Sequence, residues 1–167
     1  ALHRDGEILN RAFPFTAKAG GGIGFDVGIY AITALLSILG PVTEVAGVVR
    51  THRPTRQHYT VDRFGETFEV ENENLMAGTL QFARGTVGTI LFDSNSVFTI
   101  PEKPSLVLYG TMGVLTMADP NQFGGDVKVL LKGASEPVVI PPSHAFHSEG
   151  RGLGVAEMAW SLRLGRK

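Results

Sequence analysis

The spacing of apolar residues predicts a helix near the start of the chain. One segment has apolar side chains at intervals of three and four residues, as on one face of a helix: Val27, Ala31, Ala34, Leu35 and Ile38. Gly40 and Pro41 follow at the positions where helices commonly end. We predict a helix over residues 24–39, and we expect it to be buried on more than one side because it is apolar nearly all round.

Beyond this helix the period changes to two, which predicts strands. The candidate strands are rich in Val, Thr, Phe and Ile and cover residues 42–53, 66–73, 75–82, 86–95, 105–109, 114–117, 127–131 and 138–140. Glycine-containing turns at residues 84–85 and 110–113 predict two hairpins. A helical pattern returns over residues 152–164, whereas residues 1–19 favour a loop with a short helical turn.

This order of elements predicts the fold class. Two helices flank seven or eight strands without β-helix-β alternation, which is typical of an α+β domain. We expect residues 1–167 to form a single domain with one large, mostly antiparallel open sheet and helices on one face. The sheet face without helices is then either exposed to solvent or covered by a partner. We expect a homo-oligomer through that open face, which we assign Leu80, Phe82, Ile90, Phe92 and Val107.

Composition and charge narrow the function classes. The chain has 15 basic and 16 acidic side chains, which argues against nucleic acid or an anionic membrane surface as its partner. It has no cysteine, so disulfides and thiolate metal sites are excluded. Its longest apolar stretch, residues 29–39, is far shorter than a bilayer requires, and no signal segment opens the chain. We expect a cytoplasmic globular domain.

The glycine run at residues 20–24 suggests a phosphate-binding loop before a helix. Its spacing does not fit a dinucleotide fingerprint, because the sixth position counted from Gly20 is Phe25 and the preceding residues make a poor strand. A flexible entry that lets the helix start pack closely against another backbone explains the run better. We predict that this chain alone binds no nucleotide; a phosphorylated sugar assisted by Lys18 is a weaker possibility.

Asp26 and Tyr30 are the main candidates for chemistry. They are four residues apart, so a helix places them on one face. Asp26 lies in the first turn, where the helix dipole favours a carboxylate. A tyrosine phenol can transfer a proton, although phenols titrate near ~10 and need a neighbouring cation to do so at neutral pH. The alternative is a capping acid and a core tyrosine with its hydroxyl at the surface.

The histidines favour no metal site. His144 and His147 have a three-residue offset but follow two prolines in a predicted loop, with only Glu149 nearby as a carboxylate. His52 and His58 are isolated among basic residues. We predict that the chain holds no metal.

Taken in order, several segments resemble the C-terminal domain of the Gfo/Idh/MocA oxidoreductases. The resemblance covers nearly the whole chain. It is carried by residues 20–30 (GGGIGFDVGIY), 39–42 (LGPV), 85–90 (GTVGTI), 108–115 (LYGTMGVL), 119–125 (DPNQFGG) and 151–159 (RGLGVAEMA).

That resemblance implies a two-domain enzyme dependent on NAD or NADP. An N-terminal Rossmann domain, absent from these residues, would hold the cofactor, so no cofactor-binding residue is expected here. This chain would supply the substrate pocket and a sheet for dimerisation. Substrates in the family are mostly sugars, polyols and related hydroxy compounds. A lysine of the other domain, in a Glu-Lys-Pro motif, has no counterpart here.

The resemblance also implies residue roles. Asp26 and Tyr30 match the family's Asp-x-x-x-His/Tyr pair, with tyrosine as in proteins similar to dihydrodiol dehydrogenase and glucose–fructose oxidoreductase. Asp26, Gly21 and Gly22 would contact a hydroxy or carbonyl substrate, and Tyr30 would transfer the proton. The isolated chain would then be inactive. The rival interpretation is a non-catalytic ligand-binding or assembly domain on the same scaffold. Substrate identity, NAD against NADP and oligomer size are not assigned by the sequence.

Overall fold

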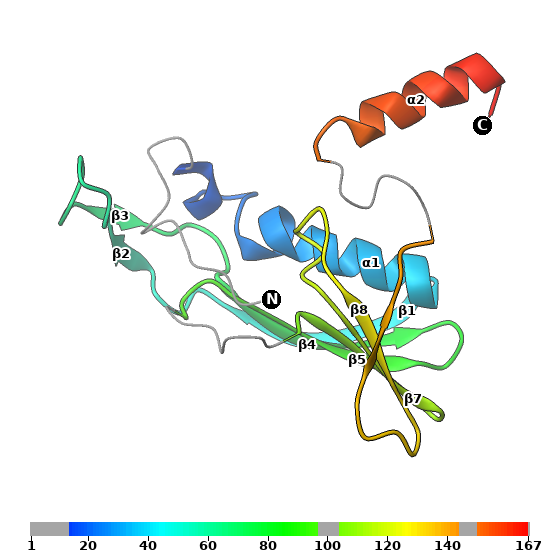
Figure 1. Ribbon diagram of the computed structural model, residues 1–167. Coiled ribbons are helices and arrows are strands. Elements are labelled where there is room, and N and C mark those ends of the chain that lie inside the picture. Colours follow the sequence, from blue (N-terminus) through cyan, green and yellow to red (C-terminus); the bar gives the residue numbers. More distant parts are fainter. Residues whose placement is uncertain (1–13, 97–103, 144–149, 167) are drawn as a thin grey trace. The chain divides into compact units, whose positions relative to one another are not determined.

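The computed structural model describes residues 14–96, 104–143 and 150–166, which fall into two compact units (Figure 1). Unit 1 comprises Ala1–Lys103 and unit 2 comprises Pro104–Lys167. The expectation that residues 1–167 form a single domain stays a prediction, and the two units are described separately below.

The described part of unit 1 starts with three helical elements, each of a different type. A 3₁₀ turn, η1 (Pro14–Ala17), is followed by a glycine-rich turn and by a single π-helical turn, η2 (Gly24–Gly28). The π turn continues directly into the α-helix α1 (Ile29–Leu39). The N–H of Gly40 donates to the carbonyl of Leu36 at 2.9 Å, so α1 ends at the glycine that the sequence predicted.

The strands of unit 1 form two antiparallel sheets. The first has the order β1 (Val42–Arg50), β4 (Leu75–Phe82), β5 (Val87–Asp93). The second is a small pair, β2 (Thr55–Gln57) with β3 (Thr67–Glu69). The predicted strands over 42–53, 66–73, 75–82 and 86–95 are confirmed with shorter ends. Strand β2 was not predicted, because three polar residues show no alternation.

The core of unit 1 lies between the helical segment and one face of β4 and β5. Ile23, Val27 and Phe92 are buried together, and Ala31, Ile32, Met76 and Ile90 pack against them. Met76 is paired directly with Phe92 across the two strands, so both side chains lie on the same face. The same face of β4 carries Leu80 and Phe82, at intervals of two residues from Met76.

Two expectations about burial are therefore wrong. Leu80, Phe82 and Phe92 are 6%, 1% and 2% exposed and do not lie on an open sheet face. The opposite face of β4 and β5, with Thr79 and Leu91, is the exposed one. Helix α1 is covered on one side only, since its large residues Ile29, Tyr30, Leu36 and Ile38 are 41–49% exposed. An apolar pattern on all sides of a helix does not predict which segments bury each side.

Unit 2 contains an antiparallel sheet of four strands in sequence order. It consists of β6 (Leu106–Gly110), β7 (Gly113–Met117), β8 (Val127–Leu131) and β9 (Val138–Ile140). Gly110 pairs with Gly113, which confirms the predicted hairpin. The helix α2 (Leu153–Leu164) confirms the second predicted helix.

The α+β class and the antiparallel pairing are confirmed, but the expected single sheet is not found in the described residues. Their strands form sheets of three, two and four strands instead of one sheet of seven or eight. Tight turns determine which neighbouring strands pair, but they do not determine which hairpins join into one sheet. Among the described helices, none is both long enough and apolar enough to cross a membrane.

Candidate functional site

The start of the helical segment is built from a tight glycine-rich turn. The N–H of Gly21 donates to the carbonyl of Lys18 at 3.0 Å, which closes the turn. Gly22 has a φ of +96°, a conformation that residues with a Cβ rarely adopt. Its carbonyl then accepts the N–H of Asp26, four residues on, at 2.9 Å, so the helical hydrogen bonds begin at Gly22.

Asp26 and Tyr30 both lie on the solvent-exposed part of this segment. Asp26 is exposed within the π turn, and Tyr30 is 42% exposed in the first turn of α1. Val27, between them in sequence, is 7% exposed and packs into the core. Both predicted side chains thus reach solvent, an arrangement that is also compatible with the alternative of a core tyrosine with its hydroxyl at the surface. The π turn adds an unusual helix start, of a kind that is frequent at functional sites.

Gly21 and Gly22 are less accessible than Asp26. Gly21 is half-buried and Gly22 is buried. A Cβ built on Gly22 would lie 3.0 Å from Cγ of Asn72, so this glycine packs directly against that side chain. Any contact of these two glycines with a ligand would involve the main chain.

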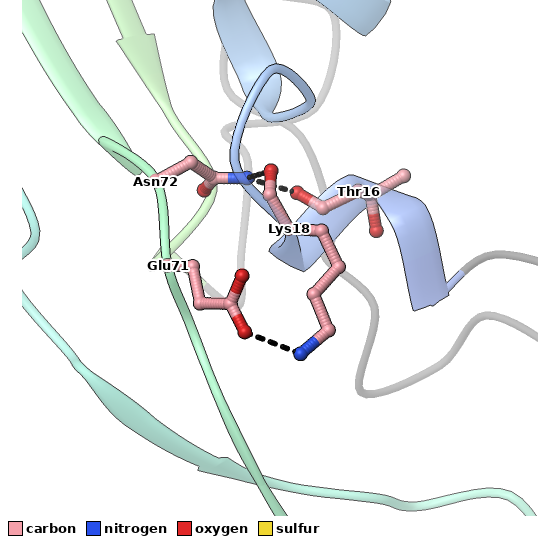
Figure 2. Close-up of polar contacts among 4 residues, drawn as sticks. All are labelled: Thr16, Lys18, Glu71 and Asn72. Carbon is pink, nitrogen blue, oxygen red and sulfur yellow. Dashed lines mark hydrogen bonds and ion pairs between the residues drawn. The ribbon is translucent and has the colours of Figure 1, made fainter.

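Asn72 ties the glycine-rich turn to the sheet (Figure 2). Its side chain is buried at 6% exposure, and its Nδ2 donates to the carbonyls of Thr16 at 2.7 Å and Lys18 at 2.8 Å. Beside it the N–H of Glu71 donates to the carbonyl of Ala17 at 2.7 Å. Two neighbouring residues before β4 therefore hold three successive carbonyls of the segment 16–18.

Lys18 is the cation nearest to the glycine run in sequence, and it is paired. Its ammonium donates to the carboxylate of Glu71, with both side chains largely exposed. The hydrogen bond from Lys18 lowers the pKa of Glu71 below its ordinary value. This pairing reduces the charge that Lys18 could offer to a phosphorylated sugar, which weakens that possibility further.

A second polar cluster lies at the end of β5. Asn74 is 2% exposed; its Oδ1 accepts the N–H of His52 at 2.8 Å, and its carbonyl accepts Nδ2 of Asn95 at 3.0 Å. Asp93 accepts the N–H of Asn95 at 2.7 Å and the hydroxyl of Ser96. Burial acts to raise the pKa of Asp93, but the hydrogen bonds from Ser96 and Asn95 outweigh it and hold that pKa below its usual value.

Arg56 belongs to the same region and is 4% exposed. Burial lowers the pKa of its guanidinium to about 10, and the charge of Asp93 opposes that change. Arg56 therefore stays charged at neutral pH, as a buried cation near Asp93.

The histidines gather no metal ligands in the part of the chain that is described. His58 packs against the ring of Phe68, with ring centroids 4.6 Å apart. No group of three or more His, Cys, Asp or Glu side chains suited to a metal occurs among the described residues. His144 and His147 lie outside them.

The glycine run does not have the arrangement of a Rossmann fingerprint. The glycine run is preceded by the 3₁₀ turn Pro14–Ala17 and followed by a π turn, not by the strand and α-helix of a Rossmann fingerprint. An open apolar hollow of about 360 Å³ lies beside the β6–β7 hairpin of unit 2, and neither Asp26 nor Tyr30 lines it.

Reasoning from the sequence missed Asn72 and the π turn. A sequence signal for Asn72 exists in the segment Glu71-Asn72-Glu73-Asn74, where glutamate and asparagine alternate. In the structure both glutamates are exposed and both asparagines are buried. Asparagine at two consecutive inward positions predicts hydrogen bonds to buried backbone groups. No comparable signal marks the π turn, whose residues fit an ordinary helix.

Comparison with known proteins supplies the remaining evidence. A family model described as the GFO/IDH/MocA C-terminal domain matches residues 3–116. Among solved structures, an NAD-binding oxidoreductase from Klebsiella pneumoniae is 20% identical with a TM-score of 0.60, over 83% of this chain and 36% of that one. Levoglucosan dehydrogenase in complex with NADH and levoglucosan is 16% identical with a TM-score of 0.62, over 99% and 46%.

A third structure is an oxidoreductase from Agrobacterium radiobacter in complex with NAD+, L-tartaric acid and magnesium. It is 16% identical with a TM-score of 0.61, over 98% of this chain and 45% of that one. At these identities the likeness shows a shared fold. The chain spans between 36% and 47% of the length of these and similar matched structures. A search of curated proteins gave no match.

Proposed function

Because the chain belongs to the GFO/IDH/MocA C-terminal domain family, we propose that it is the substrate-binding and dimerisation domain of an NAD- or NADP-dependent oxidoreductase. The substrate is a sugar, a polyol or a related hydroxy or carbonyl compound. An N-terminal Rossmann domain of the same protein holds the cofactor. The observation that carries the proposal is the exposure of Asp26 and Tyr30 at the start of one helical segment.

The proposed chemistry assigns one task to each side chain. The Asp26 carboxylate accepts a hydrogen bond from a substrate hydroxyl and so orients the carbon that reacts. In the oxidation direction Tyr30 accepts the proton of the reacting hydroxyl as a phenolate, and in the reduction direction it returns that proton as a phenol; a lysine of the cofactor domain, as a neighbouring cation, would stabilise the phenolate. The nicotinamide supplies the hydride chemistry when bound. Gly21, which is half-buried, lets the main chain approach the substrate without a side chain in the way, whereas the missing side chain of Gly22 makes room for Asn72 and leaves only its main chain to contact the substrate.

Two exposed surfaces support the dimerisation part of the proposal. The face of β4 and β5 that carries Thr79, Val87 and Leu91 is not covered by α1. In unit 2 the sheet also exposes large apolar side chains, among them Leu131 and Val138. Exposed apolar positions in this number are typical of surfaces that bind a partner, and a second copy of the chain is the partner we propose. A cytoplasmic location belongs to the same proposal, and a chain without cysteine fits a reducing compartment.

The experiment is the substitution Tyr30→Phe in the full-length protein, with Tyr59→Phe as the control. Both tyrosines are about half exposed, at 42% and 51%, so either change removes one hydroxyl from a similar setting. Reduction of NAD+ and NADP+ is followed with levoglucosan, L-sorbose and simple polyols. Tyr30→Phe should lower kcat at least about a hundredfold with little change in cofactor affinity, and Tyr59→Phe should leave kcat unchanged.

Activity of Tyr30→Phe within about tenfold of the original protein would reject Tyr30 as the proton donor. The 167-residue chain alone should neither bind NADH nor turn over, and saturable micromolar binding by calorimetry would contradict this. A full-length protein with no Gly-x-Gly-x-x-Gly motif and no Glu-Lys-Pro motif would favour the non-catalytic alternative.

A further inference from the structure

We propose that Asn72 is a positioning residue for the Asp26–Tyr30 site, because its buried amide fixes the turn from which the helical segment starts. The inference rests on the proposed function for its catalytic part. Its structural part, the anchoring of the glycine-rich turn, is independent of that function.

The first step is the hydrogen bonding of the amide. Nδ2 of Asn72 has two hydrogens, and the two carbonyls it contacts, those of Thr16 and Lys18, lie at 2.7 and 2.8 Å. Both donors are therefore used, and both acceptors belong to the main chain of the same short segment. Only a side chain with two hydrogens on one nitrogen, at this length, satisfies both carbonyls. A carboxylate of the same size would face two carbonyl oxygens without a proton to share.

The second step connects this anchor to Asp26. The carbonyl of Lys18 accepts Nδ2 of Asn72 and also the N–H of Gly21. The next residue, Gly22, packs against the Asn72 side chain and accepts the N–H of Asp26 through its carbonyl. Three hydrogen bonds in series therefore link Asn72 to the backbone of Asp26, with the Gly21–Gly22 peptide between the second and the third.

The third step concerns what holds Asn72 itself. Its carbonyl accepts the hydroxyl of Thr51 at 2.9 Å, and it lies three residues before β4. The side chains of Ile23 and Val27 fix the inner side of the helical segment against Phe92. The apolar contacts determine which side of the helix faces the sheet, but they do not fix where the helical segment starts. The Asn72 anchor supplies that second constraint, which a site with side chains on the exposed side requires.

The test compares Asn72→Ala and the milder Asn72→Ser with Asn95→Ala in the full-length protein. Asn95 is a matched control, since its side-chain nitrogen also donates to main-chain and side-chain oxygens but at the end of β5, within the Asn74–Asp93 cluster. Hydrogen exchange of peptides covering residues 16–28 is measured first. Loss of two hydrogen bonds should raise exchange there about tenfold in Asn72→Ala, with a smaller rise in Asn72→Ser and none in Asn95→Ala.

Kinetics then test the positioning role. Asn72→Ala should lower kcat/KM for the substrate about tenfold and raise the substrate KM, while the cofactor KM stays within twofold. A loss of folded protein alone would lower kcat without raising the substrate KM.

Equal exchange in the Asn72 and Asn95 variants over residues 16–28 would overturn the anchor. Faster local exchange with unchanged substrate kinetics would overturn the positioning role. If the unsubstituted protein turns over no substrate, the proposed function fails, and exchange alone then decides whether Asn72 anchors the turn.

Discussion

Gly28 lies where the helical segment packs against the sheet, and this contact allows a worked prediction. Its φ of −59° is ordinary for a helix, so alanine there meets no backbone strain. The added Cβ, however, would lie 3.0, 3.2 and 3.3 Å from three atoms of the Phe92 ring. That ring is 2% exposed and belongs to the core cluster, so it has little room to move.

Two opposing effects set the magnitude for Gly28→Ala. Replacing glycine by alanine in a helix contributes about 1 kcal/mol of stability. Overpacking a close-packed core costs about 1–3 kcal/mol. The difference predicts that Gly28→Ala lowers the free energy of unfolding by about 1 kcal/mol.

Gly24→Ala is the matched control in the same π turn. A Cβ at Gly24 would meet Sδ and Cε of Met76, at 2.7 and 3.0 Å, which is a tighter contact than that at Gly28. These atoms form the end of a flexible side chain that is only half-buried, and methionine readjusts easily. Gly24→Ala should therefore be neutral or raise the free energy of unfolding by up to about 1 kcal/mol.

The assay is urea unfolding followed by far-ultraviolet circular dichroism. With a slope of about 2 kcal/mol per molar urea, the midpoint for Gly28→Ala should fall by about 0.5 M. The fluorescence of Trp160, the only tryptophan, reports from α2 in unit 2 and serves as a separate signal. If Gly28→Ala is as stable as the unsubstituted protein and Gly24→Ala is less stable, the ring of Phe92 is not the rigid surface we describe.

Two further predictions concern the core and the polar cluster. Phe82→Ala should lower the free energy of unfolding by about 3–5 kcal/mol in the same urea assay, because the Phe82 side chain is 1% exposed. Phe64→Ala is the control: its ring is 72% exposed, so the free energy of unfolding should change by less than about 1 kcal/mol. Similar losses for both variants would contradict the burial of Phe82. Asp93 has a lowered pKa in the folded protein, so its ionised form stabilises the fold above the ordinary carboxyl pKa, and this contribution is lost as the pH falls through the folded-state value. In Asp93→Asn the free energy of unfolding should therefore fall less steeply as the pH is lowered below about 5, which urea midpoints measured across pH would show. An unchanged slope on the acid side would show that the hydrogen bonds to Asp93 do not favour its ionised form.

Most strands could be predicted because their alternation is a direct consequence of a sheet with two different faces. In β4 the inward positions Met76, Leu80 and Phe82 are apolar, and the outward positions include Thr79 and Gln81. Alternation alone does not state which face a helix covers. The assignment of Leu80 and Phe82 to an open face failed for this reason.

The candidate site could be predicted only in part. The spacing of Asp26 and Tyr30, with the family resemblance, identifies two side chains that the structure leaves exposed. The residue that anchors them, Asn72, lies 46 positions after Asp26 in the chain. It is brought to the glycine-rich turn by the return of the chain before β4, and a local pattern carries no information about such a pairing.

Several exceptions to ordinary helix and core rules in unit 1 gather around the start of this one helical segment, apart from the buried polar cluster of Arg56 and Asn74. The segment begins with a π turn rather than a capped α-helix, and it keeps Gly24 and Gly28 inside a helix, where glycine is unfavourable. It also rests on a buried asparagine rather than on an apolar residue. Each of these features lowers the stability of the fold. Together they bring the backbone of the helical segment close to the sheet while Asp26 stays exposed. Natural sequences depart from local preferences mainly where function requires it. Several unfavourable local features occur together at the residues that carry the proposed chemistry, which therefore favours a working site over a scaffold that has lost its activity.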